Sequence, residues 1–185
     1  MLLVLGTLIA GSFLVEDAVQ SWTALHLERS LGAPPWVGGL GVGLFAASMA
    51  LGRFAVQWLA RPGSDALVVG GGATALAAGV LVLALASTAP LALVGAVVAG
   101  AGVSVLAPTM FSAVGARSAP GRAGAELALV TTLGYVGFCA GPPLIGLLSA
   151  ATTLPTALAL LAVLPATVAV VGPLVLRRPA RAAVG

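Results

Sequence analysis

Residues 65–87 read DALVVGGGATALAAGVLVLALAS, and every residue apart from Asp65, Thr74 and Ser87 is aliphatic or glycine. The hydrocarbon core of a bilayer is about 30 Å thick, and a helix that crosses it needs roughly 20 mostly apolar residues. At about 1.5 Å of rise per residue, this run is long enough. The sequence therefore predicts a membrane-spanning helix here.

Comparable apolar runs lie on both sides of this stretch. Together they predict helices at 2–27, 35–59, 65–87, 90–114, 123–149 and 153–177. Each gap combines Pro or Gly with polar capping residues, and none is long enough for a soluble domain. The chain is 60% hydrophobic and 7% charged, which leaves too little polar surface for a water-soluble globule. We expect an all-α membrane protein, with one six-helix transmembrane bundle over residues 1–185.

Arginines mark alternate ends of these helices. All but Arg29 follow the second, fourth or sixth helix or lie near its end: Arg53, Arg61, Arg117, Arg122, Arg177, Arg178 and Arg181. By the positive-inside rule these ends face the cytoplasm, so both termini of a multi-pass cell-membrane protein are expected there. Without interleaved aromatics, the arginines favour anionic lipid over nucleic acid as a partner. A signal peptide over residues 1–15 is the alternative, but no basic segment precedes it.

The first predicted helix contains the only strongly polar segment within any span. Glu16, Gln20 and Thr23 share one face by their spacing, and Asp17 lies beside it, with Trp22 close by. An acid near mid-bilayer costs roughly 2.5–3.5 kcal/mol on insertion scales, so it normally faces a bundle interior or a water-filled cavity. We expect this face to line a path for solute or protons. The alternative is that the two acids mark the water boundary.

The fifth predicted helix carries an unusual run at bilayer depth. Gly134 and Tyr135 are followed by Gly141, Pro142 and Pro143. Adjacent prolines remove two backbone donors and bend a helix, and the freed carbonyls must find partners in protein or cavity water. We expect a bend, which either acts as a hinge or shapes the bundle permanently.

Glycine and alanine dominate the third and fourth predicted helices. Membrane helices associate through close backbone approach at small residues, because lipid gives apolar side chains nothing to gain by leaving it. These two helices are therefore expected to pack tightly.

Cysteine and histidine are too scarce for several kinds of chemistry. Cys139 and His26 are the only residues of their types, so we expect no disulfide framework, no metal site and no cofactor. An intramembrane serine hydrolase is the enzymatic alternative, but Gly102-Val103-Ser104 does not complete the Gly-x-Ser-Gly setting such an enzyme would need. We expect no enzymatic activity.

Seven short motifs resemble a known family in their order and spacing. They are EDA (16–18), WTAL (22–25), LGA (31–33), GLGVGLF (39–45), MALGR (49–53), TTLGYVGF (131–138) and GPPLIG (141–146). Over nearly its whole length the chain resembles the C-terminal half of a major facilitator superfamily transporter, of the prokaryotic fucose-permease-like and sugar-efflux-like branch.

This resemblance implies a fold and a mechanism. Such transporters have two six-helix halves, each built from 3+3 inverted repeats, and the solute sits between the halves near the midplane. The inward-facing polar residues of the family map here to Glu16, Asp17 and Gln20. The implied function is secondary transport of a small solute by alternating access, driven by a proton gradient or by the solute alone.

The cytoplasmic loop after the second helix departs from the family pattern. Relatives commonly have Gly-Asp-Arg after the Gly-Arg pair, whereas this chain has Val56-Gln57-Trp58 and so lacks the acid that pairs with basic residues in the closed state. The gating group expected here comprises Gly52, Arg53, Gln57, Arg61 and Asp65. Asp65 also has a local role, because an acid at a helix start is favoured by unpaired N–H groups.

Three arrangements remain open at this stage. The chain is the complement of a separate six-helix half, or a half-size transporter that works as a homodimer, or an inactive fragment or membrane scaffold. The acids, amide, hydroxyl and indole of the first helix suit sugars, organic cations or amino-acid-like solutes. The sequence leaves the choice among these solutes open.

Overall fold

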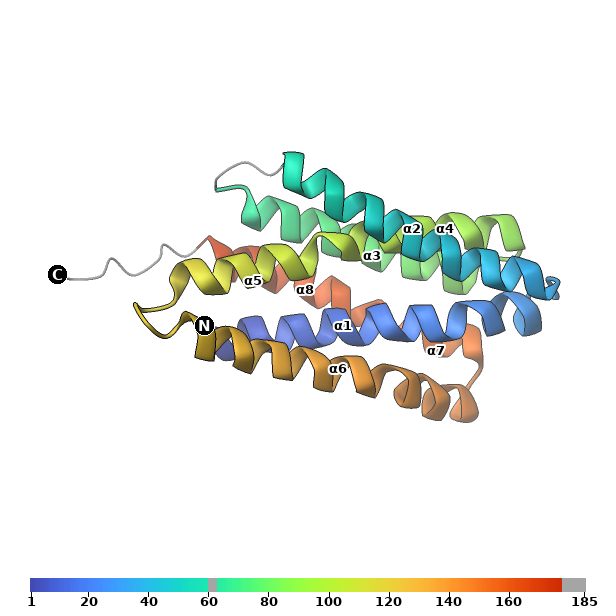
Figure 1. The fold of residues 1–185 in the computed structure, drawn as a ribbon. Helices are drawn as coiled ribbons and strands as arrows, with labels where there is room; N and C mark the ends of the chain where they lie inside the picture. Colours follow the sequence, from blue (N-terminus) through green and yellow to red (C-terminus); the bar gives the residue numbers. More distant parts are fainter. Residues whose placement is uncertain (60–62, 178–185) are drawn as a thin grey trace.

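The computed structural model describes residues 1–59 and 63–177, with the backbone only for 57–59, and the described chain is helical. The elements are α1 (Leu2–Leu25), the π-helical turn η1 (His26–Ser30), α2 (Pro35–Leu59), α3 (Asp65–Leu85), α4 (Ala89–Ser104), α5 (Leu106–Arg117), α6 (Ala123–Ala151), α7 (Leu154–Leu161) and α8 (Val163–Leu176). In these described residues they form six candidate membrane spans (Figure 1). The all-helical, six-span prediction is confirmed.

Two of the six spans are interrupted, which differs from the unbroken helices expected. The fourth span breaks at Val105 between α4 and α5, and the sixth breaks at Ala162 between α7 and α8. Pro108 and Pro165 each follow their break by three residues. A proline ring clashes with the carbonyl four residues earlier, so each helix restarts just after that point.

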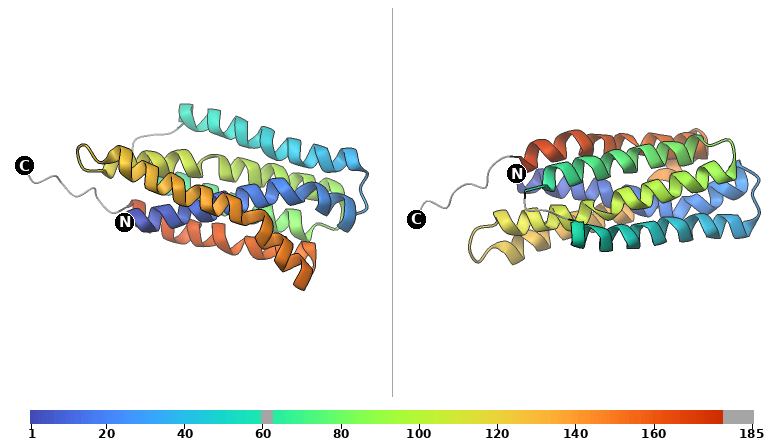
Figure 2. Two further views of the ribbon diagram at one scale, coloured as in Figure 1. Left: turned by 60° about the horizontal axis from the view of Figure 1, so that its bottom comes forward. Right: turned by 90° about the horizontal axis from the view of Figure 1, so that it is seen from above.

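The double proline of α6 has a different outcome. Pro142 and Pro143 lie inside a helix that continues from Ala123 to Ala151. Figure 2 shows the C-terminal part of α6 turning away from the direction of its first part, at the end nearest α7. The helix thus accommodates both prolines by changing direction without ending.

Three of the contacts between spans follow the pattern of two three-helix repeats. The first span lies along the fifth (α1 on α6), and the fourth lies along the second (α4 on α2). If the first, second and third spans are exchanged with the fourth, fifth and sixth, the first of these pairs becomes the second. The exchange also pairs the third span with the sixth, and α3 does pack on α8. Spans related by this exchange run in opposite directions, so the repeats are inverted.

The α3–α4 crossing brings backbone against backbone. A side chain on Gly79 would run into Ala99 and the Gly95 carbonyl, and one on Gly95 would run into Leu83. Gly102 lies equally close to the backbone of α3 at Leu76. The close packing predicted from small residues is present, and dispersion contacts between main chains hold this pair together.

Arg117 joins two helices at one end of the bundle. Met1 and the end of α8 lie at the same end (Figure 1). There the Arg117 guanidinium donates to the carbonyls of Leu176 at 2.8 Å and Ala113 at 3.2 Å, tying α5 to the last turn of α8. The bond to Leu176 satisfies a carbonyl that the end of α8 leaves without a partner.

Candidate functional site

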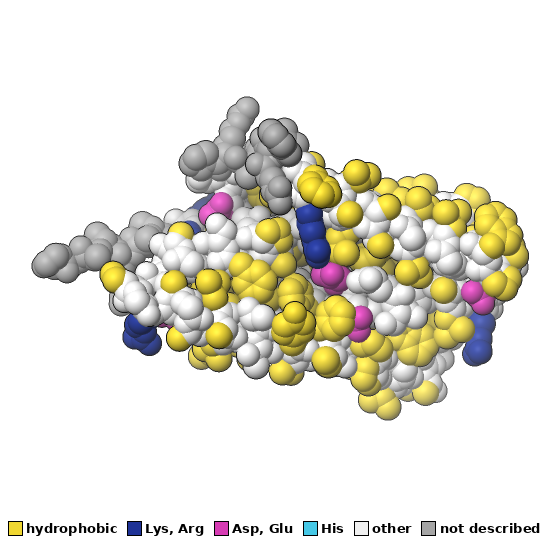
Figure 3. Space-filling model, in the orientation of Figure 1, with side chains coloured by type: hydrophobic (Ala, Val, Ile, Leu, Met, Phe, Trp, Pro, Cys, Tyr) yellow, Lys and Arg dark blue, Asp and Glu magenta, His cyan; other side chains and the backbone are white. Residues whose placement is uncertain are grey.

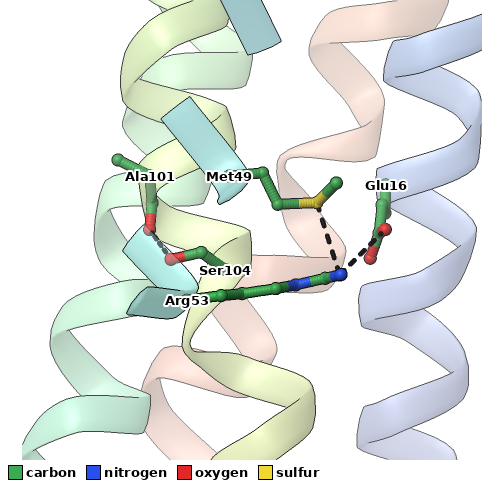
Figure 4. Close-up of polar contacts among 5 residues, drawn as sticks. All are labelled: Glu16, Met49, Arg53, Ala101 and Ser104. Atoms are coloured by element: carbon green, nitrogen blue, oxygen red, sulfur yellow. Dashed lines mark hydrogen bonds and ion pairs between the residues drawn. The ribbon is translucent and has the colours of Figure 1, made fainter. Parts of the chain in front are cut away.

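The polar segment of α1 begins near the middle of the first span, and its ion pair is with α2. Glu16 is 8% exposed, and its Oε1 lies 3.5 Å from the NH2 group of Arg53 (Figure 4). The Arg53 side chain is 47% exposed and reaches across from α2. Because an unpaired carboxylate at this depth is costly, the guanidinium stabilises the charged form of Glu16.

Arg53 makes a second contact within its own helix. Its NH2 group also lies 3.5 Å from the sulfur of Met49, one turn earlier (Figure 4). The contact with Glu16 is long for a charge-assisted N–H···O bond, which is usually about 2.7–2.9 Å, whereas 3.5 Å is an ordinary distance to the larger sulfur atom. Neither Nε nor NH1 has a partner in the described part of the chain, so the guanidinium keeps donors free.

Gly52 explains how Arg53 reaches this position. A Cβ on Gly52 would collide with the Ser104 side chain on α4, so only glycine lets α2 approach α4 here. The Ser104 hydroxyl is turned to the Ala101 carbonyl at 2.6 Å (Figure 4). Close packing at this crossing sets the register that directs Arg53 toward α1.

The other polar residues of α1 are in different environments. Asp17 and Gln20 are half-buried and have no hydrogen bond or ion pair to any residue the structure describes. Thr23 is fully buried, and its hydroxyl donates to the Val19 carbonyl at 2.6 Å. Free acid and amide groups can bind solute, whereas the hydroxyl proton of Thr23 is already used within its helix.

Trp22 connects the polar segment to the bend of α6. Its Nε1 donates to the Pro142 carbonyl at 3.2 Å. The indole ring also lies close to Gly146, where an added Cβ would be in ordinary contact with it at 3.6 Å. The pair joins two groups that the sequence singled out separately.

Among the other residues of the predicted hinge, the two glycines pack α6 on α1 and two residues are exposed. A Cβ on Gly134 would meet the Phe13 ring at 3.0 Å, and one on Gly141 would meet the Leu14 carbonyl at 2.5 Å. Tyr135 is exposed and contacts Phe13 edge-on, with ring centroids 6.4 Å apart. Pro143 is exposed.

The predicted gating group is only partly visible. Asp65 begins α3, next to Ser64, in the half-buried first turn expected for an acid at a helix start. The side chain of Gln57 and the whole of Arg61 lie outside the described residues. Among the members of this group whose side chains the structure describes, Arg53 is the one that contacts an acid of α1.

Two cavities open beside α1. One, of about 440 Å³, is lined by Ser21, Trp22, Ala24, Leu25, Glu28 and Pro142. The other, of about 380 Å³, is lined by Phe13, Arg53, Val56, Ala107, Pro108 and Phe111. Figure 3 shows a cationic side chain next to acidic side chains near mid-length on this face, among hydrophobic groups. Ligand sites in proteins usually have this character, mostly apolar with a few polar groups.

Sequence reasoning missed the structural role of His26. It is fully buried, and its Nε2 lies 3.0 Å from the Leu83 carbonyl near the end of α3. A lone polar residue at a predicted helix end was the only available signal. Within the described residues there is no group of three or more His, Cys, Asp or Glu side chains that could hold a metal ion.

Six candidate spans, with an ion pair that joins α1 to α2 inside them, define a multi-pass helical membrane protein. A sequence profile of the Major Facilitator Superfamily matches residues 3–185. The chain belongs to this superfamily, whose members are membrane transporters and not enzymes.

Curated relatives are longer than this chain. An uncharacterized MFS-type transporter of Yersinia pestis is 31% identical over 165 residues, which are 89% of this chain and 43% of that protein. The membrane protein MosC of Rhizobium meliloti is 31% identical over 158 residues, 85% of this chain and 38% of that protein. The chain thus spans less than half the length of these relatives.

Solved structures match the fold. A peptide transporter POT in complex with alafosfalin superposes with a TM-score of 0.78 at 21% identity, over 95% of this chain and 38% of that one. A POT family transporter bound to a thioalcohol-conjugated peptide gives 0.76 at 17% identity, over 98% and 39%. At this identity the likeness concerns the fold alone.

Proposed function

We propose that this chain forms one six-helix half of a secondary transporter and moves a small solute across the membrane by alternating access. The observation that carries the proposal is the Glu16–Arg53 ion pair, which places two ionisable groups inside the spans of a major facilitator protein. Such groups in membrane spans usually mark solute or proton pathways.

The one-half assignment is supported by length and symmetry. The curated relatives are more than twice as long as the segment they share with this chain. The inverted three-helix repeats match the internal architecture of a single half. We propose that the chain corresponds to a C-terminal half of the fucose-permease-like branch, and that its partner is a complementary six-helix half or a second copy.

The solute path is proposed to run along α1. Asp17 and Gln20 offer an acceptor and an amide that the described structure leaves unpartnered, and Trp22 supplies an aromatic wall next to the 440 Å³ cavity. Glu16 is the proposed proton carrier. Its carboxylate is ionised while it is paired with Arg53, and it can take up a proton when Arg53 moves away. Thr23 contributes by packing, since it is buried and bonded to its own helix.

The proposed moving parts lie at the two ends of this path. The bend of α6 is the proposed hinge. It comprises Gly134, Tyr135, Gly141, Pro142 and Pro143. Gly52, Arg53, Gln57, Arg61 and Asp65 are the proposed cytoplasmic gate.

The orientation follows from the arginine-rich end. Arg117 and Arg122 lie at the end of the bundle that also holds Met1 (Figure 1). By the positive-inside rule we propose that this end, with both termini, faces the cytoplasm of a cell membrane.

The test is transport by the assembled protein in proteoliposomes with an imposed proton gradient. Solutes from a library of sugars, amino acids and organic ions are added, and a trapped pH dye reports proton entry. We expect at least one solute to drive proton entry in the wild type, and Glu16→Gln to abolish this while inserting normally.

Glu126→Gln is the matched control. Glu126 contacts Arg122 at 3.7 Å and Ser118 at 2.8 Å at the end of the bundle, so its loss should leave proton entry intact. Solute-driven proton entry that persists in Glu16→Gln would contradict the role of Glu16. Uptake of labelled solutes is measured in parallel, and absence of uptake for every solute would contradict the transporter assignment itself.

A further inference from the structure

The 380 Å³ cavity combines a guanidinium with apolar walls. Arg53 is the one charged side chain in its lining, and Phe13, Val56, Ala107, Pro108 and Phe111 supply the rest. The Phe13 and Phe111 rings meet edge-on with centroids 6.3 Å apart, which fixes one side of the cavity. A cavity of this size lies within the usual range for small-molecule sites.

Arg53 is incompletely paired at this cavity. Its contact with Glu16 is a single one, at 3.5 Å, through NH2 alone. The described structure gives Nε and NH1 no partner, and the side chain is 47% exposed. Nε–H and one N–H of a neighbouring amino group form a planar fork that matches a carboxylate with two parallel hydrogen bonds.

Glu16 already offsets the charge of Arg53, so a second carboxylate can bind the guanidinium where Glu16 carries a proton or gives up its contact. Glu16 is on the α1 side of the guanidinium, and Asp17, the next carboxylate, does not line this cavity. The other ionisable groups of α5 and α6 near the membrane surface are engaged elsewhere: Arg117 with the Leu176 carbonyl and Glu126 with Ser118. Among described residues α4 and α8 carry no ionisable side chain.

From these contacts we propose that the cavity at Arg53 binds a small carboxylate with a compact apolar or aromatic body, which shares the guanidinium with Glu16. The carboxylate takes the free fork of Arg53, and the apolar body lies against Phe13 and Phe111. This names a solute class for the transport proposed above and rests on it. Glu16 then acts as a competitor, because it holds the same cation from the other side.

Binding of benzoate to the purified chain in phosphatidylcholine nanodiscs tests the site. Equilibrium dialysis with labelled benzoate measures affinity, with acetate as the charged probe that lacks a ring and benzamide as the ring that lacks a charge. We expect both to bind at least tenfold more weakly than benzoate. Equal binding of benzamide would overturn the proposal, because the guanidinium would then be irrelevant.

Variants separate the fork from the cavity. Arg53→Gln should weaken benzoate at least tenfold, and Arg53→Lys should do so less, since it keeps the charge and loses the fork. Glu16→Gln should bind benzoate more tightly than the wild type, by threefold or more. Arg122→Gln is the matched control, because Arg122 is exposed at the end of the bundle and should not matter. Unchanged binding in Arg53→Gln would overturn the proposal.

A second variant covers the case in which Arg53→Gln does not fold. Ala107→Leu fills the cavity from α5 and leaves Arg53 in place, so benzoate should be lost while the thermal transition is kept. Benzoate binding retained in Ala107→Leu would overturn the proposal.

Two further arms identify the source of the anion and separate this proposal from the first. At about 0.5 M salt, which screens repulsion between benzoate and an anionic membrane surface, benzoate should bind in phosphatidylglycerol nanodiscs as in phosphatidylcholine. Its loss there would assign the cavity to the headgroup of an anionic lipid and overturn the solute assignment. Because this assay measures binding without flux, its failure alongside proton-coupled flux of another solute would overturn the carboxylate site and leave the transporter assignment standing.

Discussion

The Trp22 indole donates a hydrogen bond of 3.2 Å to the carbonyl of Pro142, so the polar segment of α1 is tied directly to the bend of α6. The residues are 120 positions apart in the chain, and the bond joins the first span to the fifth. Whatever motion the bend makes must carry Trp22 with it or break this bond.

Trp22→Phe keeps an aromatic ring and removes this donor. A net hydrogen bond contributes about 0.5–1.5 kcal/mol, so we expect a loss of about 1 kcal/mol and a lower melting temperature in detergent. Trp36→Phe is the control, because Trp36 is 70% exposed at the start of α2. Equal melting temperatures for Trp22→Phe and the wild type would show that the bond contributes nothing.

Gly137→Ala should weaken the packing of α1 on α6. A Cβ at this position would collide with the carbonyl of Ala10, which is backbone and cannot move aside. Overpacking of this kind costs about 1–3 kcal/mol, measured as a drop in thermal stability.

Gly11→Ala is the matched change on the facing helix. Nothing lies within 4 Å of a Cβ there, so the gain in helix propensity should leave stability unchanged or raise it by up to about 1 kcal/mol. If both alanines had the same effect, close approach would not explain the glycine at 137.

The Glu16–Arg53 pair predicts non-additive stability changes. Arg53→Gln leaves the nearly buried Glu16 without its counter-ion, and because Arg53 is half-exposed we expect a modest loss of about 1 kcal/mol. The double variant Arg53→Gln/Glu16→Gln should recover at least half of this loss in the same melting experiment. Additive losses would mean that the two side chains do not interact.

His26→Phe should loosen the contact of the first span with the third. Leu83 has one of the last four carbonyls of α3, which a helix cannot satisfy by itself, and the His26 ring lies 3.0 Å from it. Loss of the donor should cost about 1–3 kcal/mol. His26→Gln, which restores an N–H donor, should recover part of the stability, and no recovery would assign the effect to ring packing.

Reporter insertions test the orientation. Reporters placed after residues 61 and 119 should both be cytoplasmic, and one placed after residue 33 should be on the other side, because arginines concentrate at one end of the bundle. Reporters at 61 and 119 on opposite sides would contradict the six-span topology and the transporter-half proposal with it.

The spans were predictable because a helix in lipid must be long and apolar throughout, which sequence shows directly. The breaks at Val105 and Ala162 were not predicted, although Pro108 and Pro165 carried the signal. Run length alone does not distinguish a proline that ends a helix from one, such as Pro142, that the helix absorbs.

The candidate site was only half predictable, for a geometric reason. Spacing along α1 gives the angle between Glu16, Gln20 and Thr23 about the helix axis, but not which way that face points. The structure buries Thr23 and leaves Gln20 partly open. The partnership of Glu16 with Arg53 joins different helices 37 residues apart, and it depends on how α2 crosses α4 at Gly52.

The main-chain contact between α3 and α4 has a mechanical consequence. Where side chains separate two helices, rotamer changes let one helix slide on the other. At Gly79, Gly95 and Gly102 no side chain lies between the two backbones. These two helices must therefore move as one rigid body. A displacement of either helix moves the other with it. Only the elements that flank this pair can tilt independently.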